Sequence, residues 1–350
     1  MKLIKPYDDR LTYSGRIDFD DIKKPIFCYC GTNVRCRFYG TSVYAYINNT
    51  KNDWRNFLGY LIDDKQYSFE LERDNVTHKI KLADNLENKW HDLLLFKRQD
   101  ECHYFSFEGL EVEGNVEKIH LPLRKIEIIG DSISCGEVVE ANDYIGKVDP
   151  EHHGEYSNAY YSYGWQLARM LEAEIHITSE SGIALLDDTG YFNQIDENGR
   201  HAQGMESCFD KIEFNRNYDV YKDWDFSKYT PHVVIVALGQ NDAHPIDYMK
   251  ENFNNEKSIY WRKKYKDFIE KLMSLYPLAT IILTTTILIH DSAWDRAIEE
   301  VCLDINSKRV KHYKYRRNGS GTPGHVRIEE SKEMAAELFE YINSLSIEWS

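Results

Sequence analysis

The chain has 350 residues, a length that favours two domains of ordinary size over a single core. Its 58 acidic and 43 basic side chains give a net charge of −15, and a surface of that sign disfavours binding to nucleic acids. Hydrophobic residues make up 42% of the chain, and no apolar run approaches the ~18 residues that a membrane span needs. The composition therefore predicts a soluble globular protein with neither a nucleic-acid nor a membrane partner.

The first third of the chain alternates apolar and polar residues with a period of two, which is typical of half-buried β-strands. In the run VRCRFYG, for example, Val34, Cys36 and Phe38 fall on one face. The other predicted strands occupy residues 25–30, 42–47, 57–62, 66–72, 77–83, 90–98 and 104–112. Many short strands without intervening helices predict an all-β sandwich, or jelly roll, over residues 1–121.

Near Leu121 the pattern changes to strands that alternate with helices. Predicted strands occupy residues 126–129, 232–238, 280–286 and 310–315, and one more precedes Ser179. Predicted helices occupy residues 160–173 and 257–276. Ser292 is expected to cap a third helix, with Asp295 as a shortened capping box, and the last helix is expected from about Arg327. This alternation predicts a parallel α/β domain over residues 122–350, with its ligand site at the carboxyl ends of the strands.

The cysteines are odd in number and scattered along the chain: Cys28, Cys30, Cys36, Cys102, Cys135, Cys208 and Cys302. Buried thiols and a cytoplasmic location are expected, because no signal-like segment follows Met1; a protein whose leader has been removed would instead be secreted. Cys28 and Cys30 occupy inward-facing strand positions in the predicted sandwich. Their C-x-C spacing lacks the pairing typical of zinc sites, so neither a metal nor a cofactor is predicted.

Three strand ends of the predicted parallel sheet carry groups suited to acyl transfer. Ser132 ends a Gly-Asp-Ser turn after the first strand, at the start of a helix whose amides favour developing negative charge. Gly182 follows the second strand and Asn241 the third. Each is also a common turn residue when taken alone. Together they predict Ser132 as the nucleophile, with its own N–H, the Gly182 N–H and the Asn241 amide as an oxyanion hole.

A serine nucleophile needs a base, and His325 is the predicted one. It precedes the last predicted helix, in a loop rich in Gly, Ser, Thr and Pro that can reach the same sheet edge. His244, three residues beyond Asn241, is the competing candidate. His152 and His153 lie in an acidic loop and are expected to be solvated.

Four further residues are predicted to assist at the site. Asp131 and Asp242 adjoin the nucleophile and the oxyanion asparagine, and they are expected to support them. The long segment 185–230 contains Tyr191 and Trp224, whose aromatic faces suit the apolar faces of sugar rings. The alternative interpretation is that this segment is a long connection that packs on the surface of the domain.

The blocks GDSISCGE, SGIAL, ALGQND and the histidine before RIEESKEMAAEL resemble the SGNH, or GDSL, hydrolases, and they occur in the order typical of that family. The pieces YSGRID, RFYGTSVYAYI and WDFSKYTPHVVIVALGQND further resemble carbohydrate esterase family two, in which a jelly roll precedes a flavodoxin-like SGNH domain. The resemblance covers nearly the whole chain. It implies a serine esterase that removes acetyl groups from xylo-, manno- or gluco-oligosaccharides or polysaccharides without a metal.

One position departs from the SGNH pattern. Most SGNH enzymes carry an aspartate three residues before the histidine, where this chain has Thr322. Some members of family two work with a Ser-His dyad, in which a backbone carbonyl holds the imidazole, so the resemblance implies a dyad of Ser132 and His325. Two alternatives stay open: an esterase or thioesterase for other acyl substrates, and an inactive carbohydrate-binding protein.

Overall fold

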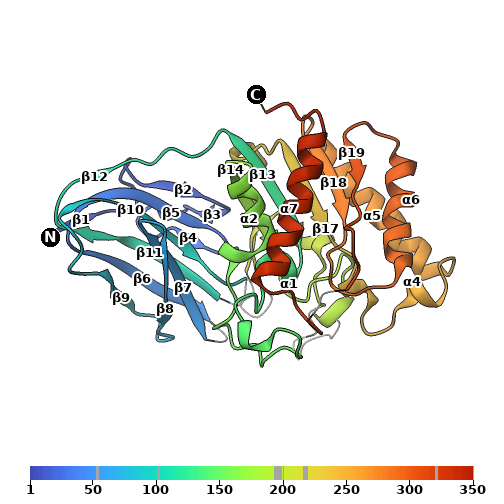
Figure 1. Cartoon of the computed structure of the whole chain (residues 1–350), viewed down its shortest axis with the longest axis horizontal. Helices are drawn as coiled ribbons and strands as arrows, with labels where there is room; N and C mark the ends of the chain where they lie inside the picture. The colour runs from blue at the N-terminus through green and yellow to red at the C-terminus, as the bar shows by residue number, and fades with distance from the viewer. Residues whose placement is uncertain are drawn as a thin grey trace.

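The computed structural model describes residues 1–52, 55–100, 103–192, 199, 201–215, 220–319 and 322–349. The N-terminal third forms a β-sandwich that packs against a parallel sheet flanked by helices (Figure 1). Within the described residues, no helix has both the length and the apolar character that crossing a bilayer requires.

Two six-stranded sheets build the sandwich. One has the order β3 (Ile17–Asp18), β4 (Ile26–Phe27), β11 (His103–Val112), β6 (Val43–Asn52) and β9 (Thr77–Ala83), with β1 (Lys2–Ile4) on β11. The other has the order β12 (Val116–Glu117), β5 (Asn33–Gly40), β10 (Lys89–Lys97), β7 (Asn56–Ile62) and β8 (Lys65–Leu71), with β2 (Thr12–Ser14) on β5. All pairings are antiparallel, which confirms the predicted sandwich.

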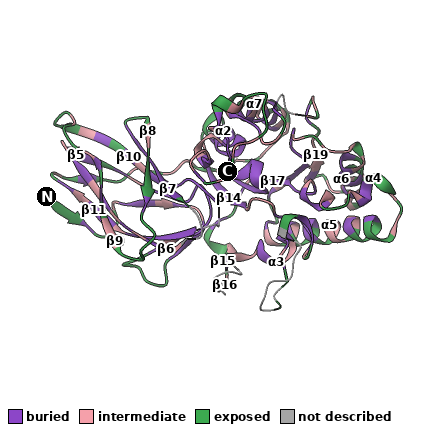
Figure 2. Cartoon of the chain, turned by 90° about the horizontal axis from the view of Figure 1, so that it is seen from below, coloured by how far each residue is buried: buried purple, intermediate pink, exposed green. Residues whose placement is uncertain are grey.

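The second part contains a five-stranded parallel sheet. Its order is β14 (Ala173–Ser179), β13 (Arg124–Gly130), β17 (Val233–Ala237), β18 (Thr280–Thr284) and β19 (Val310–His312). Helices α2 (Tyr163–Met170) and α7 (Ile328–Ser344) pack on one face, and α5 (Glu256–Leu275) and α6 (Ser292–Ile305) pack on the other. Figure 2 shows that strands β14 and β17 are largely buried. The predicted α/β fold is confirmed.

Short elements fill the connections of this sheet. They are the helices α1 (Ser132–Cys135), α3 (Met205–Cys208) and α4 (Tyr248–Glu251), and the hairpin of β15 (Lys211–Asn215) and β16 (Val220–Asp223). Single 3₁₀ turns occupy Asn142–Tyr144, Ala159–Tyr161, Gly190–Phe192, Phe226–Lys228 and Asn241–Ala243.

The start of α6 differs from the prediction. Asp291, not Ser292, caps this helix, because its carboxylate accepts a hydrogen bond of 2.9 Å from the Ala293 N–H. Asp295 does not form a capping box. Its side chain is buried and accepts a hydrogen bond of 3.0 Å from the hydroxyl of Thr285.

The cores of the two parts are joined. Cys28 and Tyr104 of the sandwich pack into the core beneath α5 and α6, and Cys30 and Phe96 pack into the core beneath α2 and α7. The last sandwich strand ends at Glu117 and the parallel sheet begins at Arg124, whereas the exact division into residues 1–121 and 122–350 stays a prediction.

No disulfide joins the cysteines that the structure describes. Cys28, Cys30 and Cys36 are buried, as expected of core residues, but only Cys36 lies in the sandwich core. The predicted strand placement of Cys28 and Cys30 is wrong, because β4 ends at Phe27 and the chain then turns toward the parallel sheet. Cys102 lies outside the described residues.

A buried ion pair ties the sandwich to the centre of the parallel sheet. The Arg16 guanidinium lies 2.9 Å from a carboxylate oxygen of Glu127 on β13, and both side chains are 1% exposed. Glu127 also accepts hydrogen bonds of 2.7 Å from the hydroxyls of Thr178 and Tyr276. The main-chain oxygen atoms of Phe209 and Lys211 accept further hydrogen bonds from Arg16.

Replacing Arg16 with Met is expected to lower the free energy of unfolding by about 3–5 kcal/mol, because the Glu127 carboxylate stays buried without its counter-charge. Urea denaturation of the whole chain measures the loss. Arg37→Met is the matched control, since Arg37 pairs with Asp92 at side-chain exposures of 45% and 61%. That exposed pair is worth about 1 kcal/mol or less. Equal losses in the two variants would contradict the assigned role of Arg16.

Candidate active site

Three neighbouring strands bring the predicted groups to one edge of the sheet. Gly130, the last residue of β13, is in register with Ser179 at the end of β14 and with Ala237 at the end of β17. Ser132 and Asn241 follow two of these strand ends by two and four positions. The edge is the carboxyl edge of a parallel sheet, where such folds place their ligand sites.

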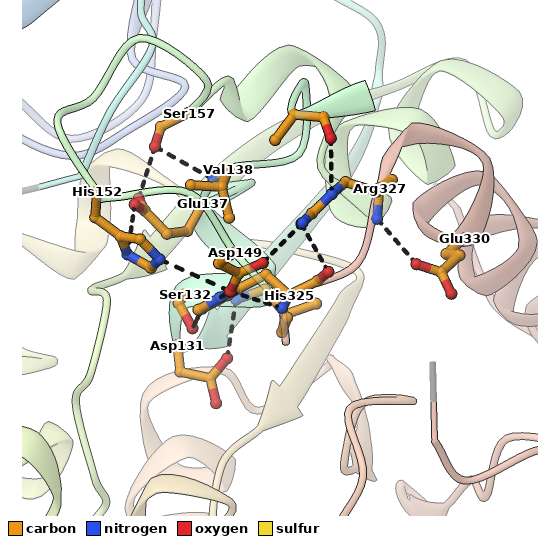
Figure 3. A network of polar contacts seen from close by, with 12 residues as sticks. Asp131, Ser132, Glu137, Val138, Asp149, His152, Ser157, His325, Arg327 and Glu330 are labelled. Carbon is orange, nitrogen blue, oxygen red and sulfur yellow. Dashed lines mark hydrogen bonds and ion pairs between the residues drawn. The ribbon is translucent and has the colours of Figure 1, made fainter. Parts of the chain in front are cut away.

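Ser132 is the first residue of α1 and is hydrogen-bonded to the predicted base. The Nε2 atom of His325 lies 2.9 Å from the Ser132 hydroxyl oxygen across 193 positions of sequence (Figure 3). Asp131 caps the helix, and its carboxylate accepts from the Ile133 N–H at 3.1 Å. Burial raises the pKa of Asp131 to about 6. The hydroxyl and the imidazole are therefore placed for proton transfer between them.

An acid also holds His325, which corrects the expected dyad. The Nδ1 atom of His325 lies 2.7 Å from the Oδ2 atom of Asp149, and the His325 main-chain N–H donates to the same oxygen at 3.1 Å. Asp149 lies in the loop between α1 and α2. The expectation that a backbone carbonyl holds the imidazole is wrong, because a carboxylate occupies that place. The three side chains form a Ser-His-Asp arrangement.

Gly324 allows Asp149 to come this close. A Cβ atom at position 324 would lie 2.6 Å from the Asp149 Oδ2 atom and 2.7 Å from its carboxyl carbon. The Gly324 φ of +123° is also one that other residues rarely adopt. The residue before His325 thus leaves room for an acid that comes from a loop distant in sequence.

Arg327 holds the other oxygen of Asp149. Its guanidinium donates to the Oδ1 atom at 2.8 Å and to the main-chain oxygen of His325 at 2.8 Å, and its Nε atom donates to that of Ala141 at 3.0 Å. Its own N–H donates to Glu330 at 3.1 Å, at the start of α7. Arg327 is 2% exposed, so its hydrogen bonds and its ion pair with Asp149 are shielded from solvent.

Asp149 is held as a carboxylate. Burial opposes its ionisation, but contacts with His152 and His325 outweigh burial and lower its pKa well below the usual 3.8. Because the pKa is lowered on folding, the stability that this carboxylate contributes is present above about pH 4 and is lost as the pH falls below it. The acid therefore stays charged throughout the neutral range.

Thr322, at the position where most SGNH enzymes have an aspartate, has a structural contact in this chain. Its hydroxyl accepts a hydrogen bond of 3.2 Å from the Gly146 N–H, and the side chain is buried. Gly146 lies three positions before Asp149 in the same loop. Thr322 therefore anchors the loop that supplies the acid.

The predicted oxyanion groups lie on segments that hold one another. The Asn241 side-chain amide donates to the Ile183 oxygen at 2.8 Å through one of its two N–H bonds. The Asp242 carboxylate accepts from the N–H groups of Leu185 and Leu186 at 2.9 and 3.3 Å. Burial raises the pKa of Asp242 to about 7. Asp242 thus supports the segment after β14.

Gly182 lies in this segment with a φ of +76°, in the left-handed region that favours glycine. The sandwich helps to position it, because the Asp100 carboxylate accepts a hydrogen bond of 3.1 Å from the Ser181 N–H. Arg98 of the sandwich donates to the main-chain oxygen atoms of Ser157 and Glu155, both at 3.1 Å. The β-sandwich therefore contacts both loops at this carboxyl edge of the sheet.

His152 is not solvated as expected. Its ring is two-thirds buried, and its centroid lies 5.2 Å from that of His325. Asp149, His152 and His325 each present a ligand atom within 4.8 Å of the others, as a metal site would. However, the hydrogen bond between His325 and Asp149 joins two of these atoms, and an ion between them would break it. We assign no metal ligand here, and the absence of a metal stays a prediction.

The two predicted aromatic contacts lie at opposite edges of the sheet. Tyr191 is 63% exposed, donates its N–H to the Gly182 oxygen at 3.3 Å and stacks on His244 with ring centroids 4.1 Å apart. His244, the competing base, thus stacks on Tyr191, and His325 is the histidine that contacts Ser132. The ring centroids of Trp224 and His176 lie 6.0 Å apart. Both residues line a cavity of about 270 Å³, to which the starts of β13 and β14 also contribute. The prediction that Trp224 contacts substrate is wrong, because it lies at the amino edge.

The parallel sheet, with Ser132, Gly182 and Asn241 on the loops at its carboxyl edge and His325 in contact with Ser132, has the SGNH-like fold and the arrangement of groups that the sequence resemblance implies. Comparisons with known proteins narrow the class. The family model for the carbohydrate esterase 2 N-terminal domain matches residues 13–122.

Two curated relatives cover most of the chain. The cellulase/esterase CelE of Acetivibrio thermocellus is 30% identical over 276 residues, which are 77% of this chain and 30% of that protein. The acetylxylan esterase / glucomannan deacetylase of Cellvibrio japonicus is 23% identical over 345 residues, which are 95% of this chain and 87% of that protein.

A solved structure agrees over nearly the whole chain. A family two carbohydrate esterase from Clostridium thermocellum, in complex with cellohexaose, is 27% identical with a TM-score of 0.78, and the match covers 95% of this chain and 98% of that one. Together these findings confirm the resemblance to carbohydrate esterase family two that the sequence blocks indicated.

Proposed function

We propose that this protein is a serine esterase that removes O-acetyl groups from carbohydrates. The observation that carries the proposal is the His325 ring, which contacts the Ser132 hydroxyl through one nitrogen and the Asp149 carboxylate through the other. Relatives described as an acetylxylan esterase and as a cellulase/esterase support the choice of an acetylated carbohydrate as substrate. The net charge of −15 suits an uncharged substrate that needs no electrostatic steering.

The chemistry starts with proton transfer from Ser132. As the hydroxyl oxygen attacks the acetyl carbonyl carbon, the Nε2 atom of His325 takes the serine proton, and Asp149 stabilises the imidazolium that forms. His325 then gives this proton to the departing sugar oxygen, and the bond between that oxygen and the acyl carbon breaks. Water attacks the acetyl-enzyme in the same way, which releases acetate and restores Ser132.

Negative charge develops on the acetyl oxygen during both attacks. The Ser132 N–H is in the first turn of α1, where amides have no acceptor within the helix. We assign it, the Gly182 N–H and the second N–H of the Asn241 amide as the donors to this oxygen. Each such donor is typically worth about 3 kcal/mol of transition-state stabilisation.

The stacked pair of Tyr191 and His244 offers a surface for a sugar ring beside these donors. It lies next to Gly182, and an exposed aromatic face suits the apolar face of a pyranose. Tyr191 is therefore kept as a candidate substrate contact, and His244 joins it.

Acyl-chain preference tests the proposed activity against the alternative of an SGNH esterase or thioesterase. The protein is expected to hydrolyse acetyl esters at least about tenfold faster than octanoyl esters, since a larger acyl group needs an apolar channel. Acetate release from acetylated xylo-, manno- and gluco-oligosaccharides then identifies the sugar and the hydroxyl. Faster cleavage of the octanoyl esters or of acyl thioesters would contradict the proposal. A protein that binds these sugars without releasing acetate would be the inactive binder.

A further inference from the structure

His152 lies between two carboxylates at the edge of the catalytic site. Its Nδ1 atom is 3.2 Å from the Glu137 Oε1 atom, and its Nε2 atom is 3.7 Å from the Asp149 Oδ2 atom (Figure 3). These contacts with Asp149 and Glu137 outweigh the effect of burial and raise the pKa of His152 to about 9. The ring therefore carries a positive charge at neutral pH.

Glu137 connects His152 to the nucleophile. It follows α1, and its main-chain N–H donates to the main-chain oxygen of Ser132 at 3.0 Å. Its side chain is 8% exposed, and its Oε2 atom accepts from the Ser157 hydroxyl at 2.8 Å. Glu137 is thus fixed on the segment that carries Ser132, and His152 links that segment to Asp149.

The charge of His152 acts on the base. Four charged or titratable groups lie around the His152 ring: Glu137 after α1, Asp149 on its own loop, His325 before α7, and Arg327, which contacts Asp149. The Asp131 carboxyl also interacts electrostatically with His325. A fixed positive charge 5.2 Å from the His325 ring opposes a second positive charge on that ring. His152 and His325 also contact the same Asp149 carboxylate, so the negative charge of Asp149 is divided between two rings. Both effects oppose an added positive charge on the His325 ring, and only a ring without that charge can accept the serine proton.

We propose that His152 is a positioning residue of this site, which ties the acid that holds His325 to the segment that carries Ser132 and whose positive charge opposes a second positive charge on His325. The proposal rests on the proposed roles of Ser132 and His325. It does not depend on which acyl group or which sugar the enzyme accepts.

The test measures how fast a fluorophosphonate inactivates the enzyme between pH 4 and 9, with mass spectrometry to identify the modified serine. In this reaction the Ser132 oxygen forms a bond to phosphorus, the P–F bond breaks, fluoride leaves and His325 takes the serine proton. In His152→Gln, the acid limb of the rate profile is expected to move by about 0.5–1 pH unit to higher pH. The plateau rate is expected to fall by about tenfold because the catalytic groups are less well positioned.

Two further variants separate charge from structure. His152→Lys keeps a positive charge and is expected to keep the acid limb at its wild-type pH, whatever its plateau rate. His153→Gln is the matched control, because His153 is 54% exposed and pairs with the exposed Glu151. It is expected to leave both the limb and the plateau unchanged. Circular dichroism checks that each variant is folded, and His152→Asn replaces the Gln variant if that one does not fold.

The proposal is overturned if the acid limb of the folded Gln or Asn variant stays in place, if the Lys variant moves equally, or if the His153 variant moves as well. A wild-type enzyme that is labelled at Ser132 but releases no acetate defeats the proposed function alone, and the shift of the limb still decides the role of His152. A wild-type enzyme that the probe never labels defeats both.

Discussion

Ser132→Ala is expected to lower the turnover of acetyl esters by at least about 10⁴-fold, because it removes the atom that forms the acetyl-enzyme. The hydroxyl is a small group whose hydrogen bond of 2.9 Å is made to the partly exposed ring of His325. Its loss should therefore leave the thermal unfolding midpoint within about 2 °C of the wild-type value. Acetate release and thermal unfolding, measured on the same sample, give both results.

Ser134→Ala is the matched control for this change. Ser134 lies on the same short helix, and its hydroxyl is hydrogen-bonded at 2.9 Å to the buried Tyr163 hydroxyl. The control should lose about 1 kcal/mol of stability and keep most of its activity, the reverse of the result expected for Ser132. Substantial acetate release by Ser132→Ala would show that another group attacks the ester.

The sequence predicts the fold correctly wherever a strand or helix is long enough to show the period of its apolar residues. The run at residues 77–83 alternates exposed or half-buried positions with buried Ile80 and Leu82, and it forms β9. Strands β3 and β12 were missed because two residues cannot show a period of two. The positions of Ser132 and Asn241 were readable for a different reason: adjacent parallel strands must end at the same edge.

The prediction that Trp224 lies at the site is wrong, and the direction of the parallel strands explains why. Trp224 lies nine positions before Val233, where β17 begins. A chain that enters a parallel strand does so at the amino edge, so the residues just before β17 lie opposite the catalytic edge. Tyr191 lies early in the same long connection, where the chain has just left β14, and it is beside Gly182.

The acid could not be located from one sequence. Asp149 and His325 are 176 positions apart, and their contact depends on the path of an irregular loop. That loop contains several acidic residues, and nothing in their spacing separates Asp149 from Glu151. The one signal was Gly324, whose missing side chain leaves room for a carboxylate, but a glycine has many other uses in a loop.

Asp149→Asn is expected to lower kcat by about 10²–10⁴-fold, since a neutral amide neither stabilises the imidazolium nor fixes the His325 tautomer as a carboxylate does. The dyad implied by the sequence resemblance predicts no such loss. Arg327 also loses its counter-charge in this variant, so kcat must be expressed per folded molecule, with the folded fraction taken from circular dichroism. Thr322→Val is the matched control, because it removes only the hydroxyl that accepts from Gly146.

Combining Asp149→Asn with Ser132→Ala distinguishes an acid that acts through His325 from one that acts independently. If Asp149 acts only through His325, it orients the imidazole and stabilises the imidazolium that forms when Ser132 is deprotonated. In that case Asp149 has no catalytic effect once the Ser132 hydroxyl is gone. The double variant should then hydrolyse acetyl esters no more slowly than Ser132→Ala alone, although it is less stable. A further loss of activity equal to that of Asp149→Asn alone would mean that Asp149 acts on the substrate directly, and the Ser-His-Asp assignment would fail.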